Sequence, residues 1–259
     1  MRKLGTIVRL QVQRSGLKVA APAGAAHPRL YEPVALLEVP ALLLTPDGVV
    51  GLVEWASGEE RVVDVHHRAH RETKNADVNG VSVGFTAHYV AMRGRFGEHL
   101  GDGVAGENVL VETVGQIDPE AVRGGLAIGT RDGTLACLER VVVAEPCAEF
   151  TRFALQLGTG DRSGDSVTEG LRFLREGMRG FYATFTGAAG VAGAVGSIGG
   201  AASAGVNADS KGAAGSTGAG ADVAGAPADV AGAGADEPGA MAADDTAAEI
   251  GRASCRERV

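Results

Sequence analysis

Residues 139–150, with the sequence ERVVVAEPCAEF, join a run of β-branched residues to a Pro-Cys pair and then to a helical pattern. Beyond Cys147 the apolar residues recur at steps of three and four, the spacing of one helix face: Phe150, Phe153, Ala154 and Leu157. We therefore expect a strand to give way to a helix at Cys147.

Two roles are open for Cys147. At a helix N-terminus, the unpaired N–H groups and the helix dipole favour the thiolate, which is the form that attacks sulfur or binds a soft metal centre. The neighbouring acidic residues Glu145 and Glu149 oppose that effect. The alternative is a small buried hydrophobic residue near a strand end, which is the common role of an unpaired cysteine.

The composition divides the chain of 259 residues. Residues 187–248 are mostly Gly and Ala and contain no aromatic residue, so they have little bulk to bury, and we expect a disordered tail. Residues 249–259, EIGRASCRERV, look like the translation of a sequencing adapter and are excluded from arguments about the fold. The predicted folding unit is therefore residues 1–186.

Charge and hydropathy exclude some classes of function. The formal net charge is −8, and residues 187–248 hold seven acidic residues and one basic residue, so we do not expect a nucleic-acid-binding protein. The apolar run near the N-terminus is interrupted by Arg9, and no segment is long enough to span a bilayer. We expect a cytoplasmic protein with no membrane partner.

The hydrophobic patterns predict a β-rich chain with several strands and three helices. Strands are predicted over residues 3–13, 34–44, 48–55, 61–65 and 181–185, and a hairpin over 126–143. Helices are predicted from Thr86, after Cys147, and from a capping box at residues 166–169.

Residues 64–79, DVHHRAHRETKNADVN, are rich in groups that bind metals or anions. His66 and His70 stand four apart, as zinc ligands on one helix face do, but no third ligand is near and Arg68 and Arg71 would repel a cation. The Arg and His side chains suit a phosphate or another oxyanion better. A solvated polar loop is the alternative.

The stretch GDGVAG matches the dinucleotide fingerprint GxGxxG through Gly101, Gly103 and Gly106. That fingerprint follows a strand and opens a helix. Here a helical pattern precedes it and a strand pattern follows it, so we do not expect nucleotide binding. A glycine-rich turn still lets backbone N–H groups approach a ligand, and Glu107 and Asn108 at its exit can hydrogen-bond one.

These residues resemble the MOSC domain, the C-terminal module of molybdenum cofactor sulfurases, which also occurs as stand-alone bacterial proteins. The resemblance covers roughly residues 5–186 and rests on four stretches in order: HHRAHRE, GFTAHYVAMRGRFGEHL running into GVAGENVLVE, PCAEF, and FLREGMRGFYATF. It implies a mainly β fold with a few peripheral helices, the MOSC-type β-barrel. Family members often continue after RGFYA with a further strand, whereas this chain passes into Gly/Ala repeats, so the barrel would lack its closing strand.

The resemblance implies a molybdenum cofactor, molybdopterin, as the ligand. Cys147 matches the family's cysteine that carries sulfur as a persulfide or ligates molybdenum, and a soft thiolate suits both tasks. The residues near the pterin phosphate would be Arg68, His70 and Arg71. The loop facing the cofactor would be shaped by Gly106, Glu107 and Asn108. No pyridoxal phosphate is expected, because the chain has no domain for it.

Two classes of function follow from this resemblance. The first is a reductase of N-hydroxylated or N-oxide substrates with Cys147 on the metal; it would need a separate electron donor, because the sequence shows no flavin or iron–sulfur motif. The second is a carrier that holds the cofactor or passes sulfur to it, for a cofactor-using enzyme, without turnover of its own. We expect cofactor binding first and reductase activity second.

Overall fold

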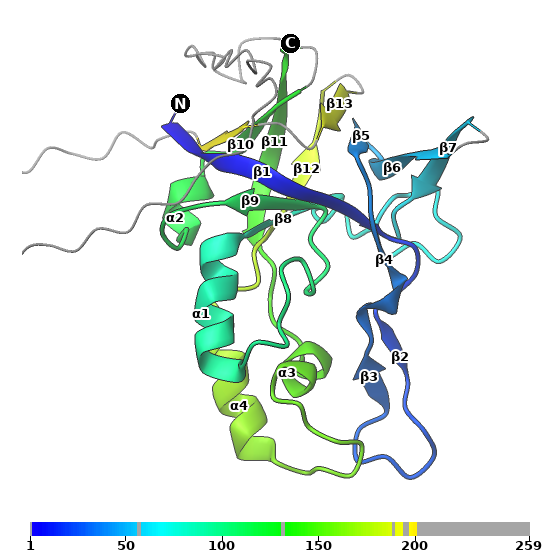
Figure 1. Ribbon diagram of the computed structural model, residues 1–259, viewed down its shortest axis with the longest axis vertical. Helices are drawn as coiled ribbons and strands as arrows, with labels where there is room; N and C mark the ends of the chain where they lie inside the picture. Colours follow the sequence, from blue (N-terminus) through cyan, green and yellow to red (C-terminus); the bar gives the residue numbers. More distant parts are fainter. Residues whose placement is uncertain (1, 56–57, 131–132, 188–189, 194–196, 201–259) are drawn as a thin grey trace, which may run out of the picture. The chain divides into compact units, whose positions relative to one another are not determined.

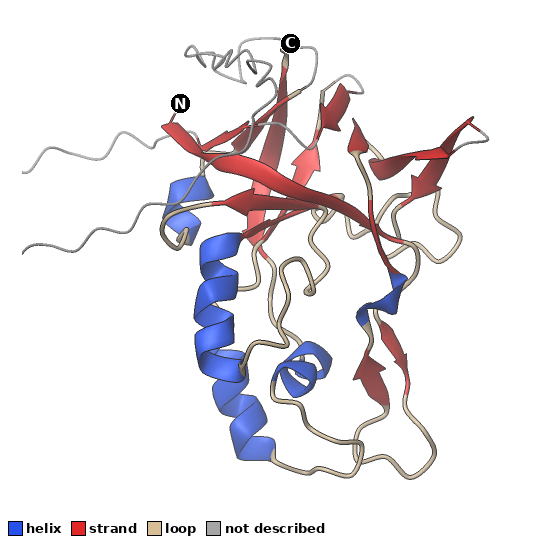
Figure 2. Cartoon of the chain, viewed as in Figure 1, coloured by secondary structure: helices blue, strands red, loops and turns tan. Residues whose placement is uncertain are grey.

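The computed structural model describes residues 2–55, 58–130, 133–187, 190–193 and 197–200. Strands dominate these residues and a few short helices accompany them (Figure 2). The prediction of a mainly β fold with peripheral helices is therefore confirmed. Most of the predicted tail 187–248, and all of residues 249–259, lie outside the described residues.

The larger sheet has the strand order β14-β10-β11-β12-β8-β9-β1-β4 (Figure 1). Its pairs are antiparallel except β8–β9, which is parallel. The strands are β1 (Arg2–Gln13), β4 (Leu36–Glu38), β8 (Val81–Phe85), β9 (Val109–Glu112), β10 (Leu126–Gly129), β11 (Leu135–Val143), β12 (Phe181–Phe185) and β14 (Ser197–Gly200).

Strand β14 pairs with β10 on one side and also with β1 on the other. Among the described residues up to 187, no strand joins β10 to β1, so that part of the sheet is open and the expected barrel within residues 1–186 is not formed. In the part of the chain that the structure describes, β14 links these two edges, and it lies beyond the predicted boundary at residue 186.

A smaller sheet has the order β13-β5-β6-β7, with β13 (Gly190–Gly193), β5 (Ala41–Thr45), β6 (Gly48–Trp55) and β7 (Gly58–Val63). The predicted strand over residues 34–44 is divided: a 3-10 turn (Pro33–Ala35) precedes β4, and Pro40 separates β4 from β5. Proline has no N–H to donate to a strand ladder, which explains the break. A separate hairpin consists of β2 (Lys18–Ala20) and β3 (Arg29–Tyr31).

The helices are α1 (Thr86–Phe96), α2 (Pro119–Val122), α3 (Ala148–Ala154) and α4 (Gly164–Phe173). The predictions of α1 and α3 are confirmed. Helix α4 begins two residues before the predicted capping box, with Ser163 as N-cap and no side-chain cap. Figure 1 shows α1, α3 and α4 gathered next to the larger sheet, and α3 contacts both α4 and β3. Among the described residues, no helix has the length and apolar character needed to cross a membrane.

Two groups of buried side chains hold this arrangement together. One lies among the strands and includes Leu10, Phe85 and Phe181. The other packs the helices against hairpin β2–β3 and includes Tyr89 and Phe150, with Cys147 partly buried against it. Each fully buried large apolar side chain contributes about 1.5–3 kcal/mol. This second group fixes the start of α3, and hence the thiol, beside the hairpin.

Candidate functional site

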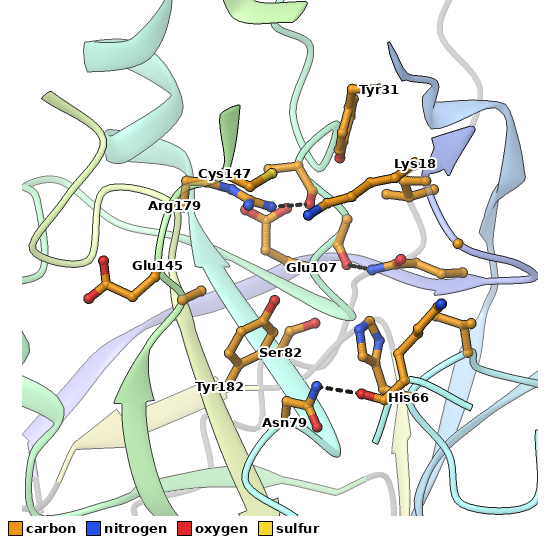
Figure 3. A pocket seen from close by; sticks show the side chains of 18 of the residues that line it. Lys18, Tyr31, His66, Asn79, Ser82, Glu107, Glu145, Cys147, Arg179 and Tyr182 are labelled. Atoms are coloured by element: carbon orange, nitrogen blue, oxygen red, sulfur yellow. Dashed lines mark hydrogen bonds between the residues drawn. The ribbon is translucent and has the colours of Figure 1, made fainter. Parts of the chain in front are cut away.

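A cavity of about 350 Å3 contains Cys147. Its walls come from hairpin β2–β3, the segment after β7, the loop before β9, the end of β11 and the turn before β12, as Figure 3 shows. We call it the thiol pocket. Of the residues predicted from the sequence, Cys147, Gly106 and Glu107 line it.

Cys147 is the N-cap of α3 and has an extended backbone, so the predicted change from strand to helix at this residue is confirmed. Its carbonyl oxygen accepts hydrogen bonds from the Thr151 N–H at 3.0 Å and from Thr151 Oγ1 at 2.9 Å. Thr151 is fully buried, so these bonds hold the first turn of the helix in place. The thiol is half-buried and lines the pocket, which excludes a sealed position in the core.

Arg179, in the turn before β12, brings a buried cation to the thiol pocket. It is 9% exposed, its Nη2 donates to the Ala105 carbonyl at 2.7 Å, and its guanidinium lies 4.5 Å from the centre of the Phe150 ring. Among the described residues it makes no ion pair, and its buried Nε has no hydrogen-bond partner. Figure 3 places it beside Cys147.

The charge on Arg179 is retained in this environment. Burial alone would lower the pKa of Arg179, but Tyr31, Tyr182 and Cys147, with a contribution from Glu107, raise it above its ordinary value. The pocket therefore holds a permanent buried cation next to a thiol.

Hairpin β2–β3 adds two more cations at the pocket wall. Lys18 Nζ lies 3.4 Å from Glu149 Oε2, and Arg29 Nη2 lies 2.7 Å from Glu149 Oε1. Burial would raise the pKa of Glu149, but its own backbone amide and then Lys18 and Arg29 outweigh burial, so the pKa lies below its ordinary value. Two cations thus share one buried carboxylate two residues after Cys147.

Glu107 brings a buried carboxyl group to the pocket. Its Oε2 accepts a hydrogen bond from Tyr89 Oη at 2.8 Å, and its side chain packs so closely on Gly84 that a Cβ there would lie 2.7 Å from its Cγ. Burial raises the pKa of Glu107, against the opposing effects of its own backbone amide, Tyr89 and Arg179. Glu107 therefore holds a proton more firmly than an exposed carboxyl group does.

Asn108 lies behind the pocket wall and is 1% exposed. Its Oδ1 accepts hydrogen bonds from the Ser82 N–H at 3.0 Å and from Ser82 Oγ at 2.9 Å. Its Nδ2 donates to Asp64 Oδ2 at 2.9 Å and to the Gln11 carbonyl at 3.2 Å. Asn108 therefore joins strands and loops instead of facing a ligand.

Asp64 orients a histidine of the pocket. Its fully buried carboxylate accepts hydrogen bonds from the Gln13 N–H at 2.7 Å and the His66 N–H at 2.8 Å. His66 Nδ1 lies 3.1 Å from Asp64 Oδ1. Because an ionised carboxylate only accepts, Nδ1 is the protonated nitrogen, and Nε2 is left as the acceptor.

The three basic residues predicted near a phosphate do not line the thiol pocket. Their segment forms turns instead of a helix. Arg68 pairs with Asp77 at 2.5 Å and lies 3.7 Å from Asp47, and Arg71 pairs with Glu72 at 3.1 Å. His70 Nε2 lies 3.2 Å from the Arg14 carbonyl. From the same segment, the residues that line the pocket are Val65, His66, Lys74 and Asn79.

Sequence reasoning missed Arg179, Lys18 and Arg29 as pocket residues. Arg179 follows Gly177 and precedes Gly180, both of which have positive φ, at +91° and +93°. A Cβ on Gly180 would lie 2.4 Å from the Val83 carbonyl oxygen, so this turn packs directly on β8. The GMRG stretch is the only sequence signal for this cation, whereas Lys18 and Arg29 have none.

Comparison with protein-family models and with curated proteins finds no match. Among solved structures, the chain is similar to the YuaD protein from Bacillus subtilis at 14% sequence identity and a TM-score of 0.40, covering 74% of this chain and 96% of that one. It is also similar to YiiM from Escherichia coli at 14% identity and a TM-score of 0.39, covering 62% of this chain and 63% of that one.

Proposed function

We propose that this chain is a MOSC-like domain that binds a molybdenum cofactor of the molybdopterin type in the thiol pocket, with Cys147 as metal ligand or sulfur carrier. One observation carries this proposal: a half-buried thiol shares a cavity with a buried guanidinium that has no carboxylate partner among the described residues.

The guanidinium of Arg179 is an argument for an anionic ligand in the thiol pocket. A buried cation is costly unless an opposite charge and hydrogen-bond acceptors accompany it. Within the described part of the chain, Arg179 has one carbonyl acceptor and no ion pair. A phosphate group in the pocket would supply the missing charge and accept from the Nε–H, and guanidinium is well suited to phosphate because of its planar set of donors.

The thiol of Cys147 is an argument for binding a metal ion that is already held by an organic ligand. Among the described residues no three His, Cys, Asp or Glu side chains are grouped so as to hold a metal ion. Structural and catalytic metal sites made only of protein ligands need at least three. A single soft thiolate can instead complete the coordination of a soft metal held by an organic ligand. When bound, the pterin cofactor would supply the metal centre together with its dithiolene sulfurs.

The other residues of the pocket fit the same ligand. The volume of about 350 Å3 lies within the range of small-molecule pockets. Gly106 has a φ of +95° and brings backbone to the pocket wall where a side chain would collide with Gln13. Burial raises the pKa of Glu107, so its carboxyl group is more readily protonated than an exposed one, and in its protonated form it can donate a hydrogen bond to a ligand atom. Lys18 and Arg29 add positive charge at the wall.

The decisive experiment measures molybdenum and pterin separately in protein purified from a molybdenum-replete host. We expect both in the native chain. Cys147→Ser should lower the ratio of molybdenum to pterin, since the thiol acts on the metal. Arg179→Met should lower both together, since the guanidinium acts on the phosphate. Arg95→Met, an exposed arginine that pairs with Glu169 outside the pocket, is the matched control and should change neither.

The outcomes separate the parts of the proposal. Equal molybdenum in the native chain and in Cys147→Ser would exclude ligation by this thiol, and absence of pterin from the native chain would overturn cofactor binding. Reduction of benzamidoxime with an artificial electron donor would identify a reductase that relies on a separate donor. Cofactor binding without that reduction would identify a carrier.

A further inference from the structure

A second cavity, of about 430 Å3, lies against helix α3 and strand β3. We propose that it is a separate binding site for a small aromatic carboxylate. Arg29 and Tyr31 line both this cavity and the thiol pocket, whereas Arg152, His99 and Phe153 line only the second. The inference does not depend on cofactor binding in the thiol pocket.

Arg152 is the main anion-binding group of this cavity. It is 9% exposed, and its Nη2 donates to the carbonyl oxygens of Gly158 at 3.2 Å and Asp161 at 2.8 Å. Its Nε is buried and has no hydrogen-bond partner, and among the described residues Arg152 makes no ion pair. The two carbonyls therefore fix the guanidinium while its charge and one donor remain unsatisfied.

His99 adds two further unsatisfied atoms. Both of its ring nitrogens are buried, and neither has a hydrogen-bond partner within the described residues. An imidazole always presents a donor, an acceptor or both, and buried polar groups in folded proteins are nearly always paired. The combination with Arg152 Nε places three unpaired polar nitrogens on two side chains of one cavity, which indicates a missing polar ligand.

The walls indicate an aromatic ligand. The Phe153 ring lies 5.9 Å from the His99 ring and 5.3 Å from the Tyr31 ring, measured between ring centres. Leu30 and Leu157 also line the cavity. A flat apolar ring can pack against these surfaces with the edge-to-face or offset geometry that aromatic pairs prefer.

The charges favour a monoanion over a phosphate monoester. Glu149 lines the cavity and is neutralised by Lys18 and Arg29, so its carboxylate is already paired. Glu32 also lines the cavity, so the three cations Lys18, Arg29 and Arg152 face two carboxylates, which leaves one positive charge in excess. A singly charged, planar carboxylate matches that charge and the fork of the Arg152 guanidinium, whereas the second negative charge of a phosphate would face Glu32 and Glu149.

The test titrates benzoate into the isotopically labelled full chain and follows backbone amide resonances. We expect saturable shifts at Leu30, Gln156 and Gly158 and none at Gly106 in the thiol pocket. Benzamide has the same shape without the charge, so it should bind about 10-fold more weakly, the loss expected for one charge-assisted hydrogen bond. Both measurements use the native sequence, so neither depends on a variant folding.

Two variants then assign the contacts. Arg152→Met and His99→Phe should each weaken benzoate binding, Arg152→Met by about 10-fold or more. Arg95→Met, which removes an arginine charge outside both cavities, should leave benzoate affinity unchanged. Circular dichroism and the amide spectrum establish that each variant is folded before its affinity is compared.

Several results would overturn the proposal. These are no saturable benzoate binding at millimolar concentration, equal affinity for benzamide and benzoate, shifts confined to residues of the thiol pocket, or unchanged affinity in folded Arg152→Met. Benzoate binding in protein that holds neither molybdenum nor pterin would leave this inference standing while the proposed function fails.

Discussion

The side-chain amide of Asn108 donates a hydrogen bond to the carboxylate of Asp64 over 2.9 Å, although 44 positions separate the two residues. This bond ties the loop before β9 to the segment after β7, and both supply residues to the thiol pocket. Asn108 was predicted to shape the loop that would face the cofactor, and its four side-chain hydrogen bonds to Ser82, Asp64 and Gln11 hold the backbone beside Glu107 in place.

Asn108→Ala should destabilise the fold by about 2–4 kcal/mol, because it leaves buried partners such as the Ser82 N–H and the Gln11 carbonyl unpaired. Urea unfolding followed by circular dichroism measures the change. Asn79→Ala, at a partly exposed residue, is the control and should cost less than about 1 kcal/mol. A similar loss in both variants would contradict a special role for Asn108.

Gly106→Ala should destabilise the chain by about 1–3 kcal/mol, because the residue has a positive φ and the new Cβ would lie 2.7 Å from Gln13 Nε2. Gly101→Ala, five positions earlier, meets no atom within 4 Å and should stay within about 0.5 kcal/mol of the native chain. Thermal unfolding of the pair compares them directly. If both substitutions were neutral, the close approach of Gly106 to Gln13 would be wrong.

Glu107→Gln should change how stability depends on pH. Burial raises the pKa of Glu107 above its ordinary value of 4.5, so the native state holds this proton more tightly than the unfolded chain does. The stability contributed by Glu107 is then fully present below pH 4.5 and is lost as pH rises through the pKa of the folded state. Glutamine cannot lose a proton, so the variant should gain stability relative to the native chain as pH rises.

Urea unfolding at a series of pH values from mildly acidic to mildly alkaline checks this expectation. Glu120→Gln is a suitable control, because Glu120 is exposed and pairs with Arg123 three residues later. The stability difference between Glu107→Gln and the native chain should increase with pH, and a difference that is constant or falls would refute the assignment.

In the neutral form of His66 the proton should lie on Nδ1, since the Asp64 carboxylate is placed to accept from that nitrogen at 3.1 Å. Long-range 1H–15N correlation spectra distinguish the two ring nitrogens. His27, whose Nδ1 lies 3.0 Å from a backbone carbonyl on an exposed loop, provides an internal comparison. A proton on His66 Nε2 in the neutral ring would contradict the role of Asp64.

Parts of the site could be predicted from sequence because they depend on local patterns. The β-branched run of β11 and the apolar spacing after Cys147 both follow from near neighbours along the chain, and both are observed. The Gly106-Glu107 corner followed by a strand was predicted for the same reason and lies in the thiol pocket.

The sequence pattern could not show whether the basic residues of segment 64–79 are free to bind a phosphate. Arg68 is drawn to Asp47 and Asp77, which lie 21 positions before it and nine after it, so its charge is already paired outside the pocket. No periodicity carries information on which carboxylate an arginine will meet.

The boundary at residue 186 was placed by composition, whereas strands β13 and β14 form beyond it by pairing with strands distant in sequence.

Two features of this chain follow from local sequence patterns: it is rich in strands, and a cysteine stands where a strand passes into a helix. Hydrophobic periodicity is a short-range property, and it is sufficient for both statements. The charges around the thiol depend on how distant segments pack: Arg179 is buried beside Cys147 with no ion pair to any described residue, and Lys18 and Arg29 pair with Glu149. The interaction energy of two charges depends on their separation in space and not on their separation along the chain. The ion pairs are therefore fixed only when the strands and helices have packed.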